Sequence, residues 1–318
     1  MKKRYRTYAS LLLLFTSFLC RSEPLVETLL TKATEAITVD LDRAEVLIEK
    51  ALEAAPDNPQ VHFVCGRVMG RQAAETVFLA LHYAGKSLDC LERAVALAPE
   101  DVRYRHGLLR FYLGAPGIAG GSRTLAKAQV QQIRQLDVVE GAKAELYYLA
   151  ETEQRDSQLM RLAELRVEFP HEVYFHYHHG LLLQQEQQYS AASAAFYQAL
   201  MPGGGDLAAI ADNIRQLSNG TEKADIAMNA LYQVGRTAVF SGEQTEQGIE
   251  ALLLFSNALQ SYHDAPPIAW AHLRLAQLYA LKRDKSEVES HLTLARESND
   301  PDLHDIAAQV RKEAGAVK

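Results

Sequence analysis

The densest group of side chains that could do chemistry is the histidine-rich stretch HEVYFHYHHG at residues 171–180. It contains four histidines: His171, His176, His178 and His179. His176 and His179 are three residues apart, so on a helix they share a face, as two ligands of one metal ion must. We favour hydrogen-bonded, partly buried histidines, because His62 and His272 fall at repeat positions equivalent to His176. The pattern therefore predicts no metal site.

A glycine-rich stretch, FYLGAPGIAGGS at residues 111–122, is the second candidate. Pro116 must end the preceding helix, and the glycines of the loop at 114–121 can adopt positive φ at little cost. Ser122 is a good N-cap for a helix that begins at Arg123. The sequence thus predicts a turn between two helices.

Such a turn can also direct backbone N–H groups at an anion. The candidate residues are Gly120, Gly121, Ser122 and Arg123. The stretch lacks the Gly-Lys-Ser/Thr end of a phosphate-binding P-loop. We favour a structural connector over an anion site, because glycine-rich turns between helices are common without ligands.

No catalytic set is evident elsewhere. The sequence contains no H-E-x-x-H, no Cys/His ligand set and no G-x-S-x-G motif. The carboxylates Glu151, Glu153 and Asp156 lie near an expected helix end, where solvated charge is the default. We expect a protein that is not an enzyme and that has no cofactor.

The N-terminus has the layout of a secretory signal peptide. Four basic residues precede an apolar run at 8–19, which is too short to span a bilayer as a helix. Cleavage after Ser22 fits best, so we expect residues 1–22 to be removed and the chain to be periplasmic. Lipidation of Cys20 and an uncleaved anchor facing the periplasm remain as alternatives.

The charge balance limits the partners. The chain has 33 Lys and Arg against 40 Asp and Glu, a formal net charge of −7. Residues 1–22 hold five basic and no acidic residues, so the mature chain would carry about −12. An acidic exported protein is a poor partner for nucleic acid, and membrane association would require a retained leader or a lipidated Cys20.

Cys65 and Cys90 are the cysteines that remain after cleavage. They could pair in an oxidising compartment. We favour two buried, unpaired thiols, because cysteine is among the most buried residue types.

Helical spacing recurs along the chain. In residues 173–204, Gly180 leaves room on a first helix, and Ala192, Phe196 and Ala199 share one face of a second. The same pattern occurs in residues 268–301, and its second half in residues 44–56. Small residues mark equivalent first-helix positions: Gly66, Gly107, Ala150, Gly180, Gly235 and Ala276.

These segments resemble tetratricopeptide repeats, helix-turn-helix units of about 34 residues. The resemblance implies an all-α solenoid with irregular repeats and a C-terminal capping helix. We expect one array at 23–202, a glycine hinge with an added helix at 203–220, and further repeats with the cap at 221–318. Residues 66–137 are similar to a group of secreted bacterial repeat proteins with an APGIAGGS loop, which implies export and fold but no catalytic residue.

The first helices of such repeats line a concave groove. We expect Arg103, Tyr104, Arg110 and Tyr174 to contribute to a protein- or peptide-binding surface there. The favoured function is a non-enzymatic exported scaffold of the bacterial envelope. The alternatives are a membrane-tethered envelope assembly factor, and an enzyme or an anion- or metal-binding protein with a site near 114–122 and His171–His179.

Overall fold

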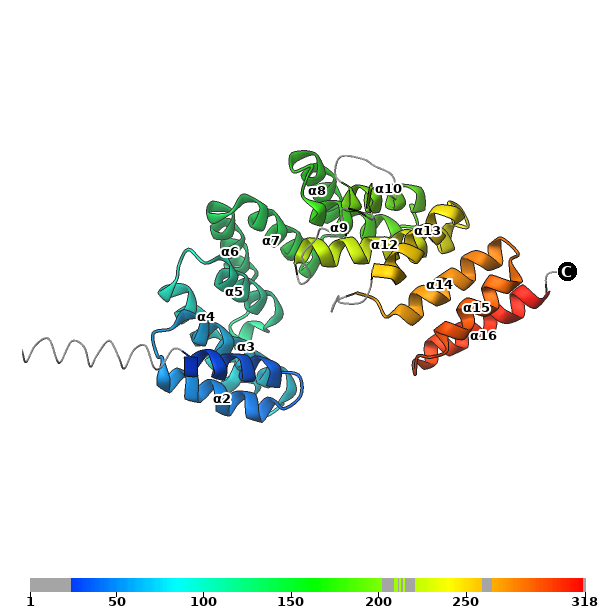
Figure 1. Cartoon of the computed structure of the whole chain (residues 1–318). Coiled ribbons are helices and arrows are strands. Elements are labelled where there is room, and N and C mark those ends of the chain that lie inside the picture. Colours follow the sequence, from blue (N-terminus) through cyan, green and yellow to red (C-terminus); the bar gives the residue numbers. More distant parts are fainter. Residues whose placement is uncertain are drawn as a thin grey trace, which may run out of the picture. The chain divides into compact units, whose positions relative to one another are not determined.

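The computed structural model describes residues 24–201, 209–210, 212, 214, 221–258 and 265–316. The regular structure of these residues is helical, as expected (Figure 1). The expected leader at 1–22 lies outside the described residues, and so does most of the expected hinge and added helix at 203–220. None of the described helices is long and apolar enough to cross a membrane.

Residues 24–36 form a first helix. The helices that follow are α2 (Leu41–Ala54), α3 (Pro59–Glu75), α4 (Ala80–Leu97), α5 (Val102–Gly114), the 3-10 turn η1 (Gly117–Ala119), α6 (Arg123–Leu136), α7 (Val138–Glu151), α8 (Arg155–Glu168), α9 (Val173–Gln185), α10 (Tyr189–Leu200), α12 (Glu222–Ser241), α13 (Thr245–Ala258), α14 (Ile268–Leu281), α15 (Lys285–Ala295) and α16 (Pro301–Ala316).

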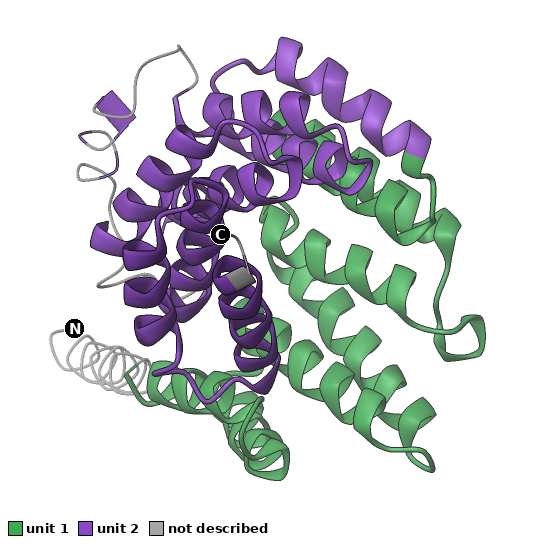
Figure 2. Ribbon diagram, turned by 90° about the vertical axis from the view of Figure 1, so that its right-hand side faces the viewer, with its two compact units in different colours: residues 1–155 green, residues 156–318 purple. Residues whose placement is uncertain are grey.

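The chain divides into two compact units, Met1–Arg155 and Asp156–Lys318, called unit 1 and unit 2 (Figure 2). In each unit, helices adjacent in sequence pack as pairs. The pairs are α3 with α4 and α5 with α6 in unit 1, and α9 with α10, α12 with α13 and α14 with α15 in unit 2. This is the tetratricopeptide-like arrangement of helix hairpins, and we call α3, α5, α7, α9, α12 and α14 the A helices.

Short polar side chains define where many helices begin. The Asp40, Asn58, Asp101 and Asp137 side chains each accept a hydrogen bond from a backbone N–H in the first turn of the helix that follows. These caps satisfy N–H groups that have no partner inside the helix. Helix boundaries are therefore encoded locally.

Small residues on A helices permit close packing, as expected. A Cβ added at Gly180 would lie 2.6 Å from the Phe196 ring of α10, and one at Gly235 would overlap Leu252 of α13. Ala150 was assigned incorrectly to this position, because it is exposed near the end of α7. Ala144, which is 0% exposed, is one of the buried small residues of that helix, together with Gly141 and Ala142.

The unit boundary differs from the expected one. We expected the division at 203–220, but α10 and α12, on either side of that segment, pack against each other in unit 2. Ile210 and Ile214 are buried in the same core as Phe196 and Leu231. The helices before and after residues 203–220 therefore belong to the same compact unit.

The expectation of two unpaired thiols is wrong. Cys65 of α3 and Cys90 of α4 form a disulfide with Cα atoms 5.9 Å apart. The antiparallel packing of the two helices brings the residues together although they are 25 positions apart in sequence. The bond covalently closes the α3–α4 hairpin of unit 1.

The C-terminal helix α16 covers the end of unit 2, as expected of a capping helix. Leu303, Ala307 and Val310 are buried against α14 and α15 in one core. The apolar stripe of the sequence is the face that packs inward.

Candidate functional site

The glycine-rich loop is an internally hydrogen-bonded connector. The N–H groups of Ala119 and Gly121 donate to the Pro116 carbonyl at 2.8 and 3.0 Å, and that of Ser122 donates to the Tyr112 carbonyl at 2.8 Å. The Gly120 N–H donates to the carbonyl of Gly117 at 3.1 Å. Because these donors are used within the turn, they do not form an outward anion cradle.

Two glycines of the loop are required for different reasons. Gly120 has a φ of 98°, the left-handed region that favours glycine. Gly121 has no positive φ, but an added Cβ would overlap the Ala115 carbonyl. The turn therefore needs glycine for backbone geometry at one position and for space at the next.

The remaining residues of the predicted anion site lie at the start of α6. Ser122 caps the helix, since its hydroxyl accepts a hydrogen bond from the Leu125 N–H at 3.3 Å. Arg123 is exposed and lines a shallow cavity of about 370 Å³ with Lys127 and Tyr148. The cavity is an open surface feature and does not include the glycines.

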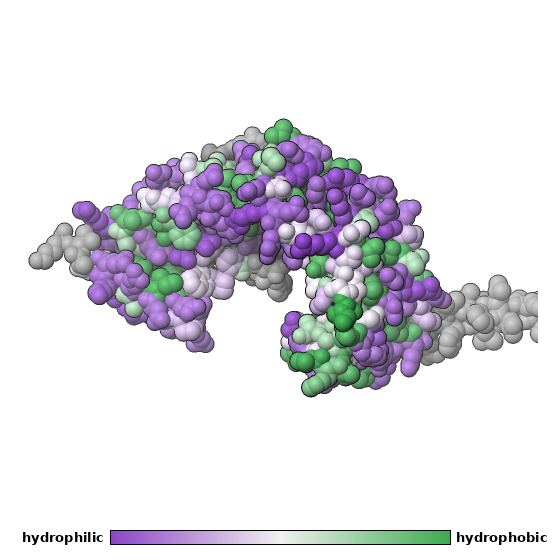
Figure 3. All heavy atoms as spheres, turned by 180° about the vertical axis from the view of Figure 1, so that it is seen from behind, coloured by the Kyte–Doolittle hydropathy of each residue, from purple (hydrophilic) through white to green (hydrophobic). Residues whose placement is uncertain are grey.

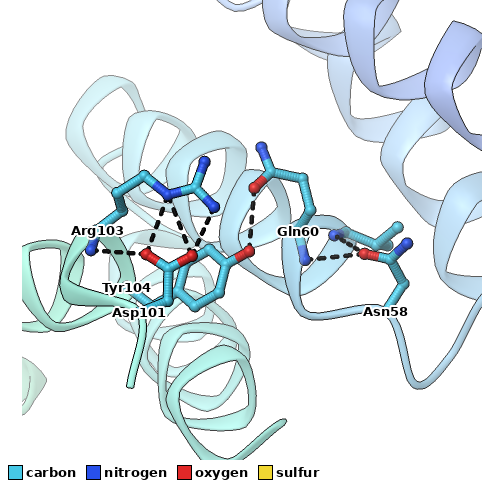
Figure 4. Close-up of polar contacts among 6 residues, drawn as sticks. Asn58, Gln60, Asp101, Arg103 and Tyr104 are labelled. Carbon is cyan, nitrogen blue, oxygen red and sulfur yellow. Dashed lines mark hydrogen bonds and ion pairs between the residues drawn. The ribbon is translucent and has the colours of Figure 1, made fainter. Parts of the chain in front are cut away.

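Tyr104 is a structural residue in unit 1. It is 3% exposed, and its hydroxyl donates a hydrogen bond to Gln60 Oε1 at 3.1 Å (Figure 4). Its ring packs against Phe63 with centroids 5.2 Å apart. The expectation that it is exposed in a groove is wrong, because the tyrosine joins α3 to α5 instead.

Arg103 is exposed, but Asp101 neutralises its charge. The two side chains form an ion pair at 2.5 Å, and the guanidinium lies 5.4 Å from the centroid of the Tyr104 ring. The Arg103 guanidinium hydrogen-bonds the Asp101 carboxyl and lowers its pKa. Figure 4 shows the carboxylate between the guanidinium and the start of α5.

The other two predicted groove residues lie in different units. Arg110 of α5 is exposed, with its guanidinium 5.6 Å from the centroid of the Tyr147 ring of α7. Tyr174 of α9 is half-buried, with its ring 4.0 Å from that of His178. Arg110, whose exposed guanidinium lies over the half-buried Tyr147 ring, therefore remains a surface cation of unit 1.

The predicted structural role of His176 is confirmed. Its Nε2 donates to the Pro170 carbonyl at 3.0 Å, and His62 Nε2 donates to the Pro56 carbonyl in the same way at 2.7 Å. His272 is not equivalent, because its Nδ1 lies 3.1 Å from Nδ1 of His291.

The hydrogen bond that His62 and His176 donate to a carbonyl six positions earlier recurs at other helix starts. Arg105 Nε donates to the Pro99 carbonyl at 2.9 Å, and His304 Nε2 donates to the Ser298 carbonyl at 2.7 Å. In each case the donor lies at the fourth position of its helix. The side chain thus anchors a helix to the turn that precedes it.

His179 is also buried, at 8% exposed. Burial lowers its pKa to about 4, and the positive charge of Arg166 acts in the same direction. A histidine in this setting is neutral at pH 7. His171 is exposed and His178 half-buried, so the four histidines of the stretch occupy different environments.

A cluster that the sequence did not predict lies on the A helices of unit 2. The Arg236 guanidinium is 4.8 Å from the centroid of the Phe240 ring, and that of Arg274 is 5.9 Å from the same ring. Arg274 also lies 5.4 Å from the Trp270 ring. The cluster therefore combines residues of α12 and α14.

Neutral amides orient both guanidiniums. Arg236 donates to Gln184 Oε1 at 2.8 Å and to Gln233 Oε1 at 3.3 Å, while Arg274 donates to Gln277 Oε1 at 2.8 Å. The sequence signal for these arginines is weak, since it consists only of their places next to the small residues Gly235 and Ala276.

Unit 1 also exposes an apolar turn between α3 and α4. Val77, Phe78 and Leu79 are 87%, 100% and 52% exposed. Figure 3 shows hydrophobic surface over the N-terminal helices, at the lower right of that view. This turn is a second surface that the sequence analysis did not single out.

No protein-family model matches the chain, and no curated protein matches it. Solved structures match over most of their length. The structure described as a functional characterisation of pilF from Pseudomonas aeruginosa has a TM-score of 0.43 and 13% identity, covering 91% of this chain and 99% of that one.

Two further structures match at similar coverage. PilW, described as a type IV pilus biogenesis factor, has a TM-score of 0.40 and 11% identity, over 89% of this chain and 98% of that one. A tetratricopeptide repeat protein from Parabacteroides merdae has a TM-score of 0.31 and 12% identity, over 91% and 98%. At these scores the similarities carry no conclusion about function.

Proposed function

We propose that this chain is a non-enzymatic scaffold that binds a protein or peptide partner in the bacterial envelope. Stacked helix hairpins present extended A-helix surfaces, which suit protein recognition better than catalysis. The observation that carries the proposal is the Arg236, Phe240, Trp270 and Arg274 cluster, because aromatic and arginine side chains dominate the energetics of protein interfaces.

Export is supported by two independent features. The sequence of residues 1–22 has the layout of a signal peptide, and the Cys65–Cys90 disulfide suits an oxidising compartment. A periplasmic location follows from this proposal. Retention of the leader or lipidation of Cys20 would instead make the chain a membrane-tethered assembly factor.

An enzyme or anion-binding site at the glycine loop is less well supported. The N–H groups that would stabilise an anion donate within the turn, and His176 is engaged by the Pro170 carbonyl. Of the groove residues predicted from sequence, Arg110 and Tyr174 remain candidate partner contacts, with Arg103 secondary because Asp101 pairs with it.

Site-specific photo-crosslinking in the natively exported protein tests the proposal. A photoreactive phenylalanine analogue placed at Phe240, which is 42% exposed, should form an adduct with one protein partner. Leu253 of α13 is the matched control at 38% exposed, and it should form none. Equal adducts at both positions, or none at Phe240, would contradict a binding role for this face.

The same sample gives the N-terminus by intact mass. A chain that begins at Glu23 supports the exported form. A mass that includes the leader or a lipid on Cys20 supports the tethered form.

A further inference from the structure

We propose that the Arg236 and Arg274 cluster binds an acidic segment of the partner, with two aspartate or glutamate side chains paired to the two guanidiniums. This inference rests on the proposed scaffold function and adds the chemistry of the partner. Its support comes from the exposed ring that both guanidiniums approach and from the groups that surround them.

The two positive charges lie near the same aromatic ring. Both guanidiniums are within 6 Å of the centroid of one ring, that of Phe240, at 4.8 and 5.9 Å. Burial lowers the pKa of Arg236, and the charge of Arg274 acts in the same direction. Two like charges in a half-buried setting repel each other, so anionic groups that pair with both guanidiniums are stabilised by both.

Neither guanidinium is neutralised by unit 2 itself. Among the described residues, no carboxylate lies within ion-pair distance of Arg236 or Arg274, and their hydrogen-bond acceptors are the amide oxygens of Gln184, Gln233 and Gln277. Arg274 Nε is buried with no hydrogen-bond partner in the described structure. The amides orient the guanidiniums and leave their charges uncompensated.

Some other arginines of the chain are paired with carboxylates. Arg311 pairs with Glu289, and Arg134 pairs with Glu145. Asp300 lies near the cluster, but its Oδ2 accepts a hydrogen bond from Trp270 Nε1 at 3.0 Å and its Oδ1 accepts one from the Asp302 N–H. One oxygen of this carboxylate therefore orients the Trp270 indole, and the other accepts a hydrogen bond from a backbone N–H in the first turn of α16.

Charge and shape together favour a short acidic peptide segment. Two cations call for two carboxylates, and planar guanidiniums match carboxylate geometry. The Phe240 ring, 42% exposed, offers an apolar contact for a neighbouring side chain of the segment. A nucleic-acid backbone would need a longer run of cations, in a chain whose net charge is −7.

Selection from a random dodecapeptide library tests the inference. The library is displayed with blocked C-termini and is selected against the full chain, so that only side-chain carboxylates are available. Selected peptides should contain at least two Asp or Glu. The R236Q/R274Q variant should lose this enrichment, whereas R283Q, which changes an exposed arginine of the same unit, should retain it.

Affinity measurements complete the test. A selected peptide should bind the R236Q/R274Q variant at least about tenfold more weakly than the wild type, and replacing its acidic residues by amides should have the same effect. Thermal unfolding of the variant shows whether the fold is intact. The R274Q single variant, whose arginine has fewer internal hydrogen bonds, gives the same test if the double variant unfolds.

Several results would overturn the inference. The first is a library that yields no peptides, or peptides that are not enriched in acidic residues. The second is a folded R236Q/R274Q variant that binds a selected peptide as tightly as the wild type does. The third is a dodecameric RNA that binds more tightly than the selected peptides, in a way that depends on the two arginines. A partner crosslinked at Phe240 through a segment without acidic residues would leave the scaffold function standing and remove this inference. Absence of any adduct at Phe240 would remove the binding role proposed for this face, and this inference with it.

Discussion

In unit 1 the guanidinium of Arg103 pairs with Asp101 and lies over a buried tyrosine, whereas in unit 2 Arg236 and Arg274 lie over an exposed phenylalanine with only amide acceptors. Both arrangements sit on A helices of the same hairpin type. In the first, the charge is satisfied within the protein. In the second, the described residues supply no paired carboxylate, and this is where we propose that a partner binds. On that proposal, one repeat architecture serves folding in one place and recognition in another.

The units also differ in what stabilises them. Unit 1 contains the Cys65–Cys90 disulfide. Unit 2 contains neutral buried histidines, among them His176 and His179, whose pKa values are lowered by burial. Burial also lowers the pKa of His106 in unit 1, but unit 2 has four such histidines: His176, His179, His272 and His291. Reduction should therefore act on unit 1, and acidification should act most strongly on unit 2.

The largest effect should come from Phe196→Ala in unit 2. The ring is 0% exposed and fills the space against Gly180, so its removal should cost about 3–5 kcal/mol of unfolding free energy. Hydrogen exchange with mass spectrometry should show faster exchange in α9 and α10. Equal loss of protection in α3 and α4 would mean that the units do not unfold separately.

Reduction of the disulfide should have the next largest effect, and in unit 1. Opening a link between residues 25 positions apart should cost about 3 kcal/mol in the chain-entropy model. Denaturant unfolding with and without reductant measures the difference, and the C65A/C90A variant serves as a control that no longer responds. A response located in unit 2 would contradict the comparison.

Acidification should destabilise unit 2. The pKa of His179 is about 4 in the folded chain against an ordinary value near 6.5, so the unfolded chain binds the proton more readily between these values. Its stabilising contribution is present above pH 6.5 and is lost as the pH falls toward 4, by about 1–3 kcal/mol. Urea unfolding at pH 7 and pH 4.5 measures the loss.

His179→Gln is the control for the acid effect. The variant should start from a lower stability at pH 7 and show a smaller change on acidification. An unchanged pH slope would assign the acid sensitivity to other groups, such as His176.

The smallest effect should come from Asp101→Asn in unit 1. Asparagine keeps the N-cap of α5 but removes the charge that pairs with Arg103, whose side chain is 65% exposed. Because exposed ion pairs contribute little, the loss should be about 0.2–1 kcal/mol. A thermal shift larger than that of R236Q/R274Q would reverse the contrast between the two sites.

Much of the fold could be predicted from local patterns. The spacing of Gly180 and Phe196 gave a correct helix pair because close packing demands a small residue opposite a large one. Ala150 shows the limit of this approach. If Ala144 is taken as the equivalent position instead, the separations from Gly107 and to Gly180 change from 43 and 30 residues to 37 and 36. Only burial, which the structure reveals, distinguishes these two alanines of one helix.

The candidate site was less predictable. The sequence indicated that arginines and tyrosines of A helices matter, but it did not reveal that Tyr104 is buried or that Asp101 neutralises Arg103. Pairing of Cys65 with Cys90 depends on the register between α3 and α4, which no local pattern fixes. The cluster at Arg236 and Arg274 depends on contacts between helices that are far apart in sequence.

The side chains that reach back six residues, at His62, Arg105, His176 and His304, couple neighbouring hairpins. Each bond ties the start of one helix to the turn that ends the previous hairpin. In a linear array these bonds act as nearest-neighbour coupling energies of an Ising chain. Disorder that begins in one hairpin therefore weakens the anchoring of the next, and the cooperative length within each unit exceeds a single repeat.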